Sequence, residues 1–453
     1  MLAVSPDALK KKITEQEVIK KIFNYPFIDR VYLVGGAIRE LLLGKIPKDY
    51  DFALGEQEDL KMFEEAFGTP AFVLGKKPIQ THRIVIKDAS IDITFLKNTI
   101  EEDLARRDFT MNAIAYDVRE DKIIDTLHGI EDIKKRIIKY PERDTIKNDP
   151  LRMLKAIRHF STLKGFSLHN ELIETIKELK HLINQTAPER IKYEMDYIIS
   201  SENAFIGMKM MEHVGLLFEI FPELYPLKQM DEEKGFILET YGHTIDGFKY
   251  LKKYNQPYSL DEKTFKNVGY ALLFHDLGKA YTFSCDEKKG VVHFLYHERF
   301  SKEIASVIME RLRFSSQEIK TILKLIENHM RIFLISNKES TEKATRRLVY
   351  KMGELTPSLI LLTICDMYGS SGGKNNVSTK QVKRRCNDIF NVYQEWKRKP
   401  LPKIINGNDL LSLGFLEGPA IGKCLQEIRE KQISGEIQEK EVALNYARLF
   451  LKS

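Results

Sequence analysis

The hydrophobic pattern of this chain changes its period near residue 136. Before that point, short apolar runs such as residues 31–34 and 91–96 are bounded by glycine or polar residues, which is typical of buried strands. After it, apolar residues recur every three or four positions, which predicts helices. The sequence therefore predicts an α+β protein, with a mixed α/β head followed by all-α domains.

The same pattern predicts the individual elements. In the head we expect strands at 31–34, 49–54, 72–74, 83–87 and 91–96 and helices at 1–22, 37–43, 101–116 and 130–136. Later helices are expected at 149–163, 170–183, 188–199, 203–225, 266–279, 299–313, 316–329, 356–368 and within 378–450. Because 453 residues are too many for one ordinary core, we expect about four units, at 1–136, 137–228, 229–372 and 373–453.

The composition is that of a soluble protein, with 43% hydrophobic and 30% charged residues. A net charge of +6 permits a local RNA-binding patch without demonstrating one. The four cysteines are widely spaced and suit free thiols in a reducing cytosol. The N-terminus has no signal-peptide pattern, and no stretch approaches the ~18 apolar residues of a membrane span. We therefore expect a cytoplasmic protein without a membrane segment.

Two glycines followed by two aspartates form the first candidate site. Gly35 and Gly36 end the first strand, and they would let the backbone approach a triphosphate, with Arg39 adding positive potential. Asp49 and Asp51 alternate on the second strand, so their carboxylates share one face. Mg²⁺ prefers such oxygen ligands, and two Mg²⁺ ions stabilise the attacking and leaving oxygens of nucleotidyl transfer. A lone Asp-x-Asp would more often be a solvated strand edge.

This combination resembles the nucleotidyltransferase superfamily that includes DNA polymerase beta. In such sites a third carboxylate comes from a neighbouring strand, and Asp92 is our candidate. Asp88 is the competing residue, although its position favours a turn.

A second motif, residues 104–116, resembles the ribose-recognition motif of class II CCA-adding enzymes. The resemblance implies that Arg107 and Asp108 hold the ribose hydroxyls, with Asn112 nearby at i+4 on the same helix face. Asp108 could also simply cap a helix, and both readings can hold together.

A third motif, residues 148–160, resembles the protein template with which this family selects bases. There Asp149 and Arg152, at i and i+3 of an expected helix, would face one base edge. The carboxylate would accept the exocyclic amine that cytosine and adenine share, and unpaired polar groups would reject the other bases. The alternative is a surface salt bridge. The family pattern is broken twice, because Asn148 replaces a glutamate and Lys155 replaces an arginine.

A fourth motif resembles the family's neck motif, in which Glu189, Arg190 and Glu194 would position the neck helices. Arg158 is a candidate for phosphate or neck contacts. Four ordered motifs therefore indicate the family of class II CCA-adding enzymes and bacterial poly(A) polymerases. The resemblance implies a nucleotidyltransferase head, a neck with base-selection and RNA-binding helices, Mg²⁺ as cofactor, and tRNA, CTP and ATP as partners.

A second set of candidate ligands lies in the helical region. In chain order they are His243, His275, Asp276, His297, His329 and Asp366. This series resembles the ligands of HD-domain phosphohydrolases, and imidazole with carboxylate suits divalent transition metals. A single histidine is more often a packed core residue, but six in this order indicate a metal centre in an HD domain at 229–372.

The remaining tail, 373–453, resembles the helical tRNA-binding tail of family members with HD domains. Three classes of function stay open: tRNA end synthesis, a phosphohydrolase with a decayed transferase, and an RNA-binding module. Within the first class, the product could be CCA, CC, A alone or poly(A). Only residues 96–100 separate Phe95 from Glu101, where CCA-adding relatives carry a longer flexible loop, and this short connector favours CC addition.

Overall fold

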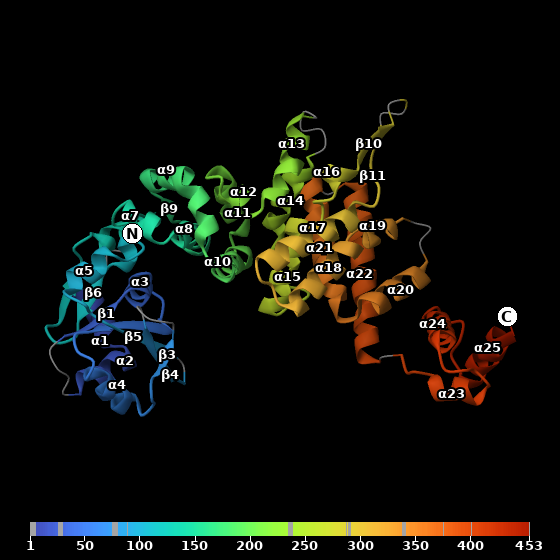
Figure 1. The fold of residues 1–453 in the computed structure, drawn as a ribbon, viewed down its shortest axis with the longest axis horizontal. Coiled ribbons are helices and arrows are strands. Elements are labelled where there is room, and N and C mark those ends of the chain that lie inside the picture. Colours follow the sequence, from blue (N-terminus) through green and yellow to red (C-terminus); the bar gives the residue numbers. More distant parts are fainter. Residues whose placement is uncertain are drawn as a thin grey trace. The chain divides into compact units, whose positions relative to one another are not determined.

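The computed structural model describes residues 6–25, 30–74, 80–87, 89–233, 239–286, 288, 291–337, 341–374, 376–399 and 401–452. They form two compact units, one of residues 1–195 with 210–220 and one of residues 196–209 with 221–453. The sheet lies in the blue N-terminal part of Figure 1, and the yellow-to-red part is almost wholly helical.

A seven-stranded sheet in the order β3-β4-β5-β2-β1-β6-β7 organises the first unit. Its strands are β1 Val31–Val34, β2 Asp49–Leu54, β3 Phe72–Leu74, β4 Thr81–Ile86, β5 Ala89–Phe95, β6 Ala115–Asp117 and β7 Lys122–Ile124. The first three predicted strands are confirmed with the same bounds, and β4 and β5 begin two residues earlier than expected. β2 is central, because it pairs antiparallel with β1 and parallel with β5.

The helices of the head depart from expectation at two places. The single helix expected over 1–22 is two helices, α1 (Pro6–Thr14) and α2 (Glu17–Phe23), because Gln16 between them is extended. The helix expected over 101–116 is wrong: α5 (Ile100–Ala105) stops, and a short 3₁₀ turn leads into β6. Residues 109–118 are all buried, and periodicity alone cannot tell a fully buried strand from a buried helix. The other head helices are α3 (Gly36–Leu42), α4 (Asp59–Phe67) and α6 (Gly129–Lys135).

Beyond the head the first unit is helical, as predicted, apart from a short parallel pair, β8 (Ile137–Ile138) with β9 (Ser167–Leu168). Its helices are α7 Asp144–Asn148, α8 Leu151–Thr162, α9 Asn170–Leu179, α10 Pro188–Ser200, α11 Ala204–His213 and α12 Leu216–Ile220, with α10 and α11 shared between the units. The helix expected from Asp149 begins only at Leu151, because Asp149 is extended, with φ −144°. Pro150 explains this, since a proline disfavours helical backbone in the residue before it.

The second unit packs helices around α21 (Thr356–Ser370), of which all residues except Ser370 are buried. The helices α13 Tyr225–Glu233, α14 Thr240–Leu251, α15 Glu262–Phe274, α16 Lys279–Thr282, α17 His297–Arg311, α18 Ser316–Asn328, α19 Arg331–Leu334, α20 Glu342–Met352 and α22 Val377–Arg398 accompany it. A hairpin, β10 (Phe283–Asp286) with β11 (Val291–Phe294), was not predicted. The last helices, α23 Gly407–Ser412, α24 Pro419–Ile433 and α25 Lys440–Lys452, share a small core that includes Leu410 and Cys424.

One helical run, Glu342–Ser370, is long and apolar enough by length and composition to cross a membrane. The expectation that no stretch comes near this limit is therefore wrong. Most of the apolar window, 72%, is buried among the other helices of its unit. Such burial is typical of the core helix of a large helical domain, which α21 is.

Candidate active site and metal centre

Three carboxylates gather on the central strands of the sheet. Asp49 and Asp51 lie on β2 and Asp92 on β5, and the parallel register sets Asp51 beside Asp92 and Asp49 beside Ser90. Residues that are two apart on a strand, and their neighbours in register, share one face of a sheet. The structure thus brings the three predicted carboxylates together. The competitor Asp88 lies outside the described residues.

Two polar partners, which the sequence did not single out, hold these carboxylates. The Ser90 hydroxyl donates a hydrogen bond to Asp49 at 2.6 Å. The Arg83 guanidinium donates two hydrogen bonds to Asp92, both at 2.6 Å, from the neighbouring strand β4. Bidentate pairing of this kind fixes both side chains in one orientation.

The surroundings of Asp51 disfavour its charged form. Burial raises its pKa to about 6; the Arg107 charge opposes this, and the neighbouring Asp92 and Asp49 charges add to it. A half-buried carboxylate beside two others is stabilised in its charged form by a cation, and three hard oxygen donors suit Mg²⁺. Asp49 and Asp51 therefore fit a divalent metal, and Asp92 joins this donor set only when its bidentate pair with Arg83 opens.

The glycine turn lies directly over this site. Gly35 has φ +76°, and a Cβ placed on it would lie 2.8 Å from Arg107 Nη1 and 3.0 Å from Asp51 Oδ2. Only glycine fits here, on both conformational and steric grounds. Gly36 begins α3, and Arg39 on that helix donates a hydrogen bond to the Asn112 side chain. Burial lowers the pKa of Arg39, and its Nε has no hydrogen-bond partner.

Arg107 is held by a buried acid, Asp103, one helical turn before it. Its Nε and Nη2 donate hydrogen bonds to Asp103 Oδ2 at 3.1 and 3.0 Å. Arg106 donates to the other oxygen, Oδ1. Burial alone would raise the pKa of Asp103, but the Arg107 and Arg106 guanidinium groups hold it below its ordinary value. Asp103 is a site residue that the sequence analysis missed.

Asp108 and Asn112 are not on a common helix, so that part of the expectation is wrong. Their side chains nevertheless meet, because Asn112 Nδ2 donates to Asp108 Oδ1 at 2.9 Å. Asp108 also accepts the Phe109 backbone N–H at 2.9 Å and lies 3.8 Å from Lys155 Nζ on α8. The Asp108 carboxylate does not cap the short 3₁₀ turn that follows, since that turn starts from Phe109 without a side-chain cap.

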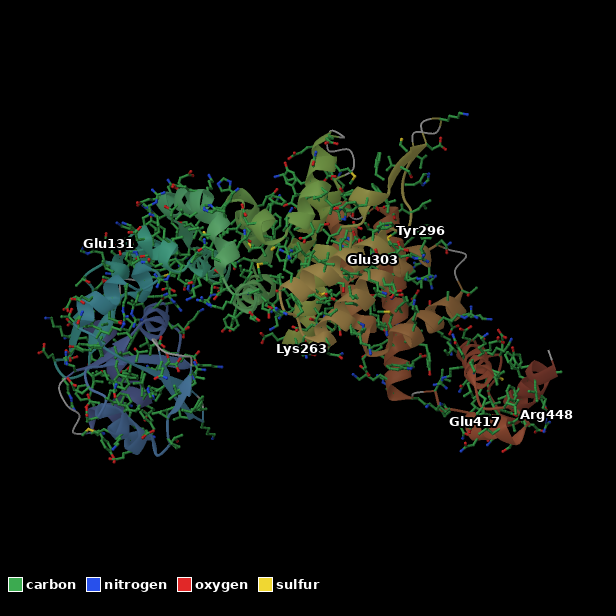
Figure 2. All side chains as sticks on the ribbon, in the orientation of Figure 1. Glu131, Lys263, Tyr296, Glu303, Glu417 and Arg448 are labelled. Atoms are coloured by element: carbon green, nitrogen blue, oxygen red, sulfur yellow. The ribbon has the colours of Figure 1, made fainter. Side chains whose placement is uncertain are left out.

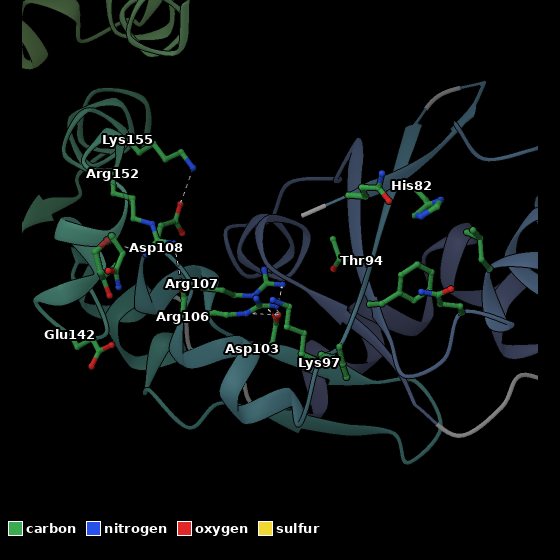
Figure 3. Close-up of a pocket in the computed structure, with 17 residues that line it drawn as sticks. His82, Thr94, Lys97, Asp103, Arg106, Arg107, Asp108, Glu142, Arg152 and Lys155 are labelled. Atoms are coloured by element: carbon green, nitrogen blue, oxygen red, sulfur yellow. Dashed lines mark hydrogen bonds and ion pairs between the residues drawn. The ribbon is translucent and has the colours of Figure 1, made fainter. Parts of the chain in front are cut away.

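A cavity of about 960 Å³ adjoins these residues (Figure 3). Its lining includes Arg107 and Asp108, with Arg152 and Lys155 of α8. Figure 3 shows Lys155 reaching toward Asp108, and Arg152 on the same helix. Arg152 donates hydrogen bonds to the backbone carbonyls of Arg106 at 2.9 Å and Thr145 at 3.2 Å. The cavity is large enough for a nucleotide-sized ligand.

Residues of the head and of the segment just after it, none of them predicted as ligand-binding residues, complete the lining. These are Gln57, Leu60, Gln80, His82, Thr94, Phe95, Leu96, Lys97, Asp103, Arg106, Glu142, Thr145 and Asn148.

Asp149 is not among the residues that line this cavity. Because its backbone is extended, Asp149 lies before the first residue of α8. Its carboxylate accepts a hydrogen bond from Arg190 of α10 at 3.0 Å. The helical i, i+3 arrangement expected for Asp149 and Arg152 is therefore wrong. Two other predicted neck residues do meet, since Arg158 Nε lies 3.2 Å from the buried Glu194 carboxylate.

Comparison with known proteins decides the family. The chain matches the family model "Poly A polymerase head domain" over residues 31–139 and "Probable RNA and SrmB- binding site of polymerase A" over 165–227. Residues 284–447 match domain 2 of tRNA nucleotidyltransferases. The chain is 30% identical to the CC-adding tRNA nucleotidyltransferase of Thermus thermophilus, over 93% of this chain and 94% of that one. The chain belongs to the tRNA nucleotidyltransferase family.

A relative with a different specificity is almost as similar. The A-adding tRNA nucleotidyltransferase of Deinococcus radiodurans is 27% identical over 91% of this chain and 93% of that one. Among solved structures, a CCA-adding enzyme with CTP aligns with a TM-score of 0.68 at 19% identity, covering 99% of this chain and 98% of that chain. The Thermotoga maritima CCA-adding enzyme complexed with tRNA aligns with a TM-score of 0.60 at 19% identity, covering 98% of this chain and 95% of that chain. These likenesses establish the fold of a tRNA nucleotidyltransferase.

The six predicted ligands of the second site also converge, inside the second unit of this tRNA nucleotidyltransferase. His243 comes from α14, His275 and Asp276 follow α15, His297 begins α17, His329 follows α18, and Asp366 lies on α21. They form two overlapping groups, His243–His275–Asp276–Asp366 and Asp276–His297–His329, which share Asp276. Figure 2 labels Tyr296, the exposed neighbour of the buried His297.

The geometry of the imidazoles points their Nε2 atoms at one another. Each Nδ1 lies 2.7–2.9 Å from a backbone carbonyl oxygen, namely that of Glu239, Leu272, Phe294 or Ile326. A neutral ring that donates from Nδ1 leaves a lone pair on Nε2. His243 Nε2 lies 2.8 Å from Asp276 Oδ2, and His297 Nε2 lies 3.3 Å from Asp276 Oδ1.

The cluster carries unsatisfied polar atoms at its centre. His243 Nε2, His275 Nε2 and both Asp276 oxygens are buried and make no hydrogen bond with good geometry. Lone pairs that face carboxylate oxygens in a buried space are costly unless a cation lies between them. Imidazole and carboxylate donors together suit a divalent transition metal, so the residues fit such an ion.

The charges around this cluster shift the pKa values of two of its histidines in opposite directions. When no ion is bound, burial lowers the pKa of His275, but the Asp276 and Asp366 charges outweigh it and raise that pKa to about 10. His275 must therefore release its second proton before its Nε2 lone pair can bind a metal. Burial and the His275 charge lower the pKa of His329 to about 3. Lys279, which the sequence analysis did not select, lies 2.6 Å from Asp276 Oδ2 and adds positive charge at the edge of the cluster.

Proposed function

We propose that this chain adds cytidines to the 3′ end of tRNA without a nucleic-acid template, using CTP, and stops after two additions. Two observations together carry the proposal: the cavity lined by Arg107, Asp108 and Arg152, and the three carboxylates on the paired strands β2 and β5. The carboxylates do not line the cavity, but Arg107, which does, lies near Asp51 at the Gly35 turn. A transferase needs both elements, one for the metal and one for the incoming nucleotide. The likeness to a CC-adding relative over almost the whole chain supports the product.

Asp49, Asp51 and Asp92 would hold Mg²⁺. When bound, the metal would polarise the α-phosphate and stabilise the leaving oxygens. The protein's own contribution is positional. Gly35 and Gly36 leave room for the triphosphate, and Arg39 supplies positive potential at the start of α3.

Arg107 and Asp108 would bind the ribose, since both line the cavity, and Asn112 would support Asp108, to which it donates a hydrogen bond. Arg152 and Lys155 would face the base from α8. For Asp149 to read a base, its ion pair with Arg190 must open, and that pair is partly exposed, with 52% of the Arg190 side chain accessible. An exposed ion pair of this kind contributes only ~0–1 kcal/mol, so the binding free energy of a nucleotide is enough to open it. Arg158 would support α8 through Glu194.

The short connector supports the CC-only product. Between β5 and α5 there are only residues 96–99, and two of them, Leu96 and Lys97, line the cavity. Four residues reach at most ~14 Å when extended. Such a connector is too short to act as a lever that enlarges the pocket for a purine after two additions. The likeness to an A-adding relative leaves the addition of A alone as an alternative product, together with CCA or poly(A) synthesis.

The product is tested by offering CTP and ATP together to a tRNA that ends at position 73. We expect extension by two cytidines and no adenosine, read by sequencing gel or mass spectrometry. ATP alone, given to a tRNA that already ends in CC, serves as the control and should give no extension. A product ending in CCA, or addition of A to the control substrate, would refute the CC-only assignment.

Replacing Asp108 by alanine should lower the use of CTP about ten- to a hundredfold more than the use of dCTP, because only the ribose 2′-OH loses a partner. Steady-state kcat/KM for the two nucleotides measures this directly. A matched control is Asp144→Ala, an exposed aspartate on α7 outside the cavity lining. Equal losses on CTP and dCTP would assign Asp108 a purely structural role.

A second function is favoured by the buried cluster of the second unit. His243, His275, Asp276, His297, His329 and Asp366 would bind divalent transition metal and support phosphohydrolase activity on RNA ends or nucleotides. The buried lone pairs without hydrogen bonds support this assignment. We also propose the organisation expected from sequence: head 1–136, neck 137–228, HD domain 229–372 and tRNA-binding tail 373–453, in a cytoplasmic enzyme.

A further inference from the structure

Asp103 is a buried carboxylate shared by two arginines. It is 7% exposed, and between them Arg106 and Arg107 direct four N–H donors at its two oxygens. Asp103 does not lie on the sheet face of the carboxylates, and it has no part in the metal-binding set. Its charge is therefore committed to the two arginines.

Arg107 also lies close to Asp51. Arg107 Nη1 and Asp51 Oδ2 both border the position of a Gly35 Cβ, at 2.8 and 3.0 Å. Among the charges that act on Asp51, Arg107 has the largest effect in favour of the ionised form. Arg107 uses Nε and Nη2 for Asp103, so Nη1 is the atom left on the side of Asp51.

A free guanidinium at this place would pair with Asp51. Asp51 lies beside Asp92 in register and two residues from Asp49 on one face of the sheet, so a cation is attracted to this group of carboxylates. An arginine in that position would occupy the carboxylate that the metal needs. The two cations compete for one ligand.

We propose that Asp103 is a positioning residue that holds Arg107 away from Asp51 and so keeps Asp51 available to Mg²⁺. The inference rests on the proposed role of Asp51 as a metal ligand. Asp103 also fixes the position of Arg107 at the cavity through two hydrogen bonds. The same carboxylate binds Arg106, whose backbone carbonyl accepts a hydrogen bond from Arg152. One buried acid thus sets the positions of two cavity arginines.

The test is Asp103→Asn in the full-length chain, with Mg²⁺ binding measured by calorimetry. Binding that depends on Asp51 is defined by its absence in Asp51→Asn, which also separates it from binding in the second unit. Asp103→Asn should weaken this component about tenfold, because the released Arg107 would compete with the metal for the Asp51 carboxylate, and a close opposite charge stabilises a carboxylate by roughly one factor of ten or more. Glu101→Gln, an exposed acid on the same helix, is the matched control and should bind as the wild type does.

The double variant Asp103→Asn, Arg107→Gln decides the mechanism. It removes the acid together with its partner, leaves no displaced arginine, and should restore the Asp51-dependent Mg²⁺ affinity. Unchanged affinity in Asp103→Asn, or weak binding that persists in the double variant, would overturn the inference. If the wild type and Asp51→Asn give the same isotherm, the proposed metal site itself is wrong, and this result is distinct from the other two.

Discussion

Replacement of Asp51 by asparagine is expected to lower CMP incorporation into tRNA by at least about a thousandfold. The substitution keeps the size of the side chain and removes one of three carboxylates that lie side by side on β2 and β5. Each tenfold loss corresponds to ~1.4 kcal/mol of barrier, and loss of a ligand that holds the metal removes several kcal/mol of transition-state stabilisation. Asp49→Ala should have a similar effect, because its carboxylate projects from the same face.

Single-turnover incorporation of labelled CTP measures this loss, and filter binding measures tRNA affinity in parallel. Asp144→Asn provides a control with the same chemical change at an exposed position of the same unit. The affinity for tRNA should stay near the wild-type value, since the lost charge is negative and the phosphate backbone is bound by cations. Turnover close to wild type in Asp51→Asn would show that the chemistry lies elsewhere.

Much of the head could be predicted because its strands are short, apolar and bounded by glycine or polar residues. The bounds of β1, β2 and β3 agree with the prediction. The segment after α5 could not be predicted, because residues 109–118 are buried on all sides and carry no period. β6 forms there through long-range pairing with β1, which no local pattern reveals.

Candidate site residues were predictable where they belong to a motif and hidden where only the fold brings them together. Asp92 was found because a strand pattern surrounds it. Arg83 binds Asp92 only through the pairing of β4 with β5. Asp103 looks like one more acid in the first turn of a helix, and its burial between two arginines is visible only in three dimensions. Pro150 was the available signal that Asp149 would not be helical.

The double substitution His275→Ala, Asp276→Ala should remove all divalent metal bound by the second unit. Asp276 belongs to both overlapping groups, and His275 belongs to the larger of them. Without Asp276, the groups lose the carboxylate whose two oxygens lie 2.8 Å from His243 Nε2 and 3.3 Å from His297 Nε2. The remaining histidines lack a shared anionic ligand, so the loss should be complete at micromolar metal, while nucleotide addition survives.

Metal content is measured by mass spectrometry of the purified full-length protein after loading with Mn²⁺ or Ni²⁺ and desalting, with and without Asp51→Asn, so that metal at the proposed transferase site is subtracted. Hydrolysis of bis(p-nitrophenyl) phosphate gives a second readout and should be lost together with the metal. His293→Ala, an exposed histidine on β11, is the control and should retain both. Thermal unfolding of the metal-loaded wild type should lie above that of the metal-free form, because an ion that binds only the folded chain stabilises it by mass action. In the double variant on an Asp51→Asn background, which removes the metal proposed for the transferase site, added metal should leave the unfolding temperature unchanged. A shift that persists there would place the metal on other ligands, whereas loss of nucleotide addition in a folded double variant would show that the two units depend on each other.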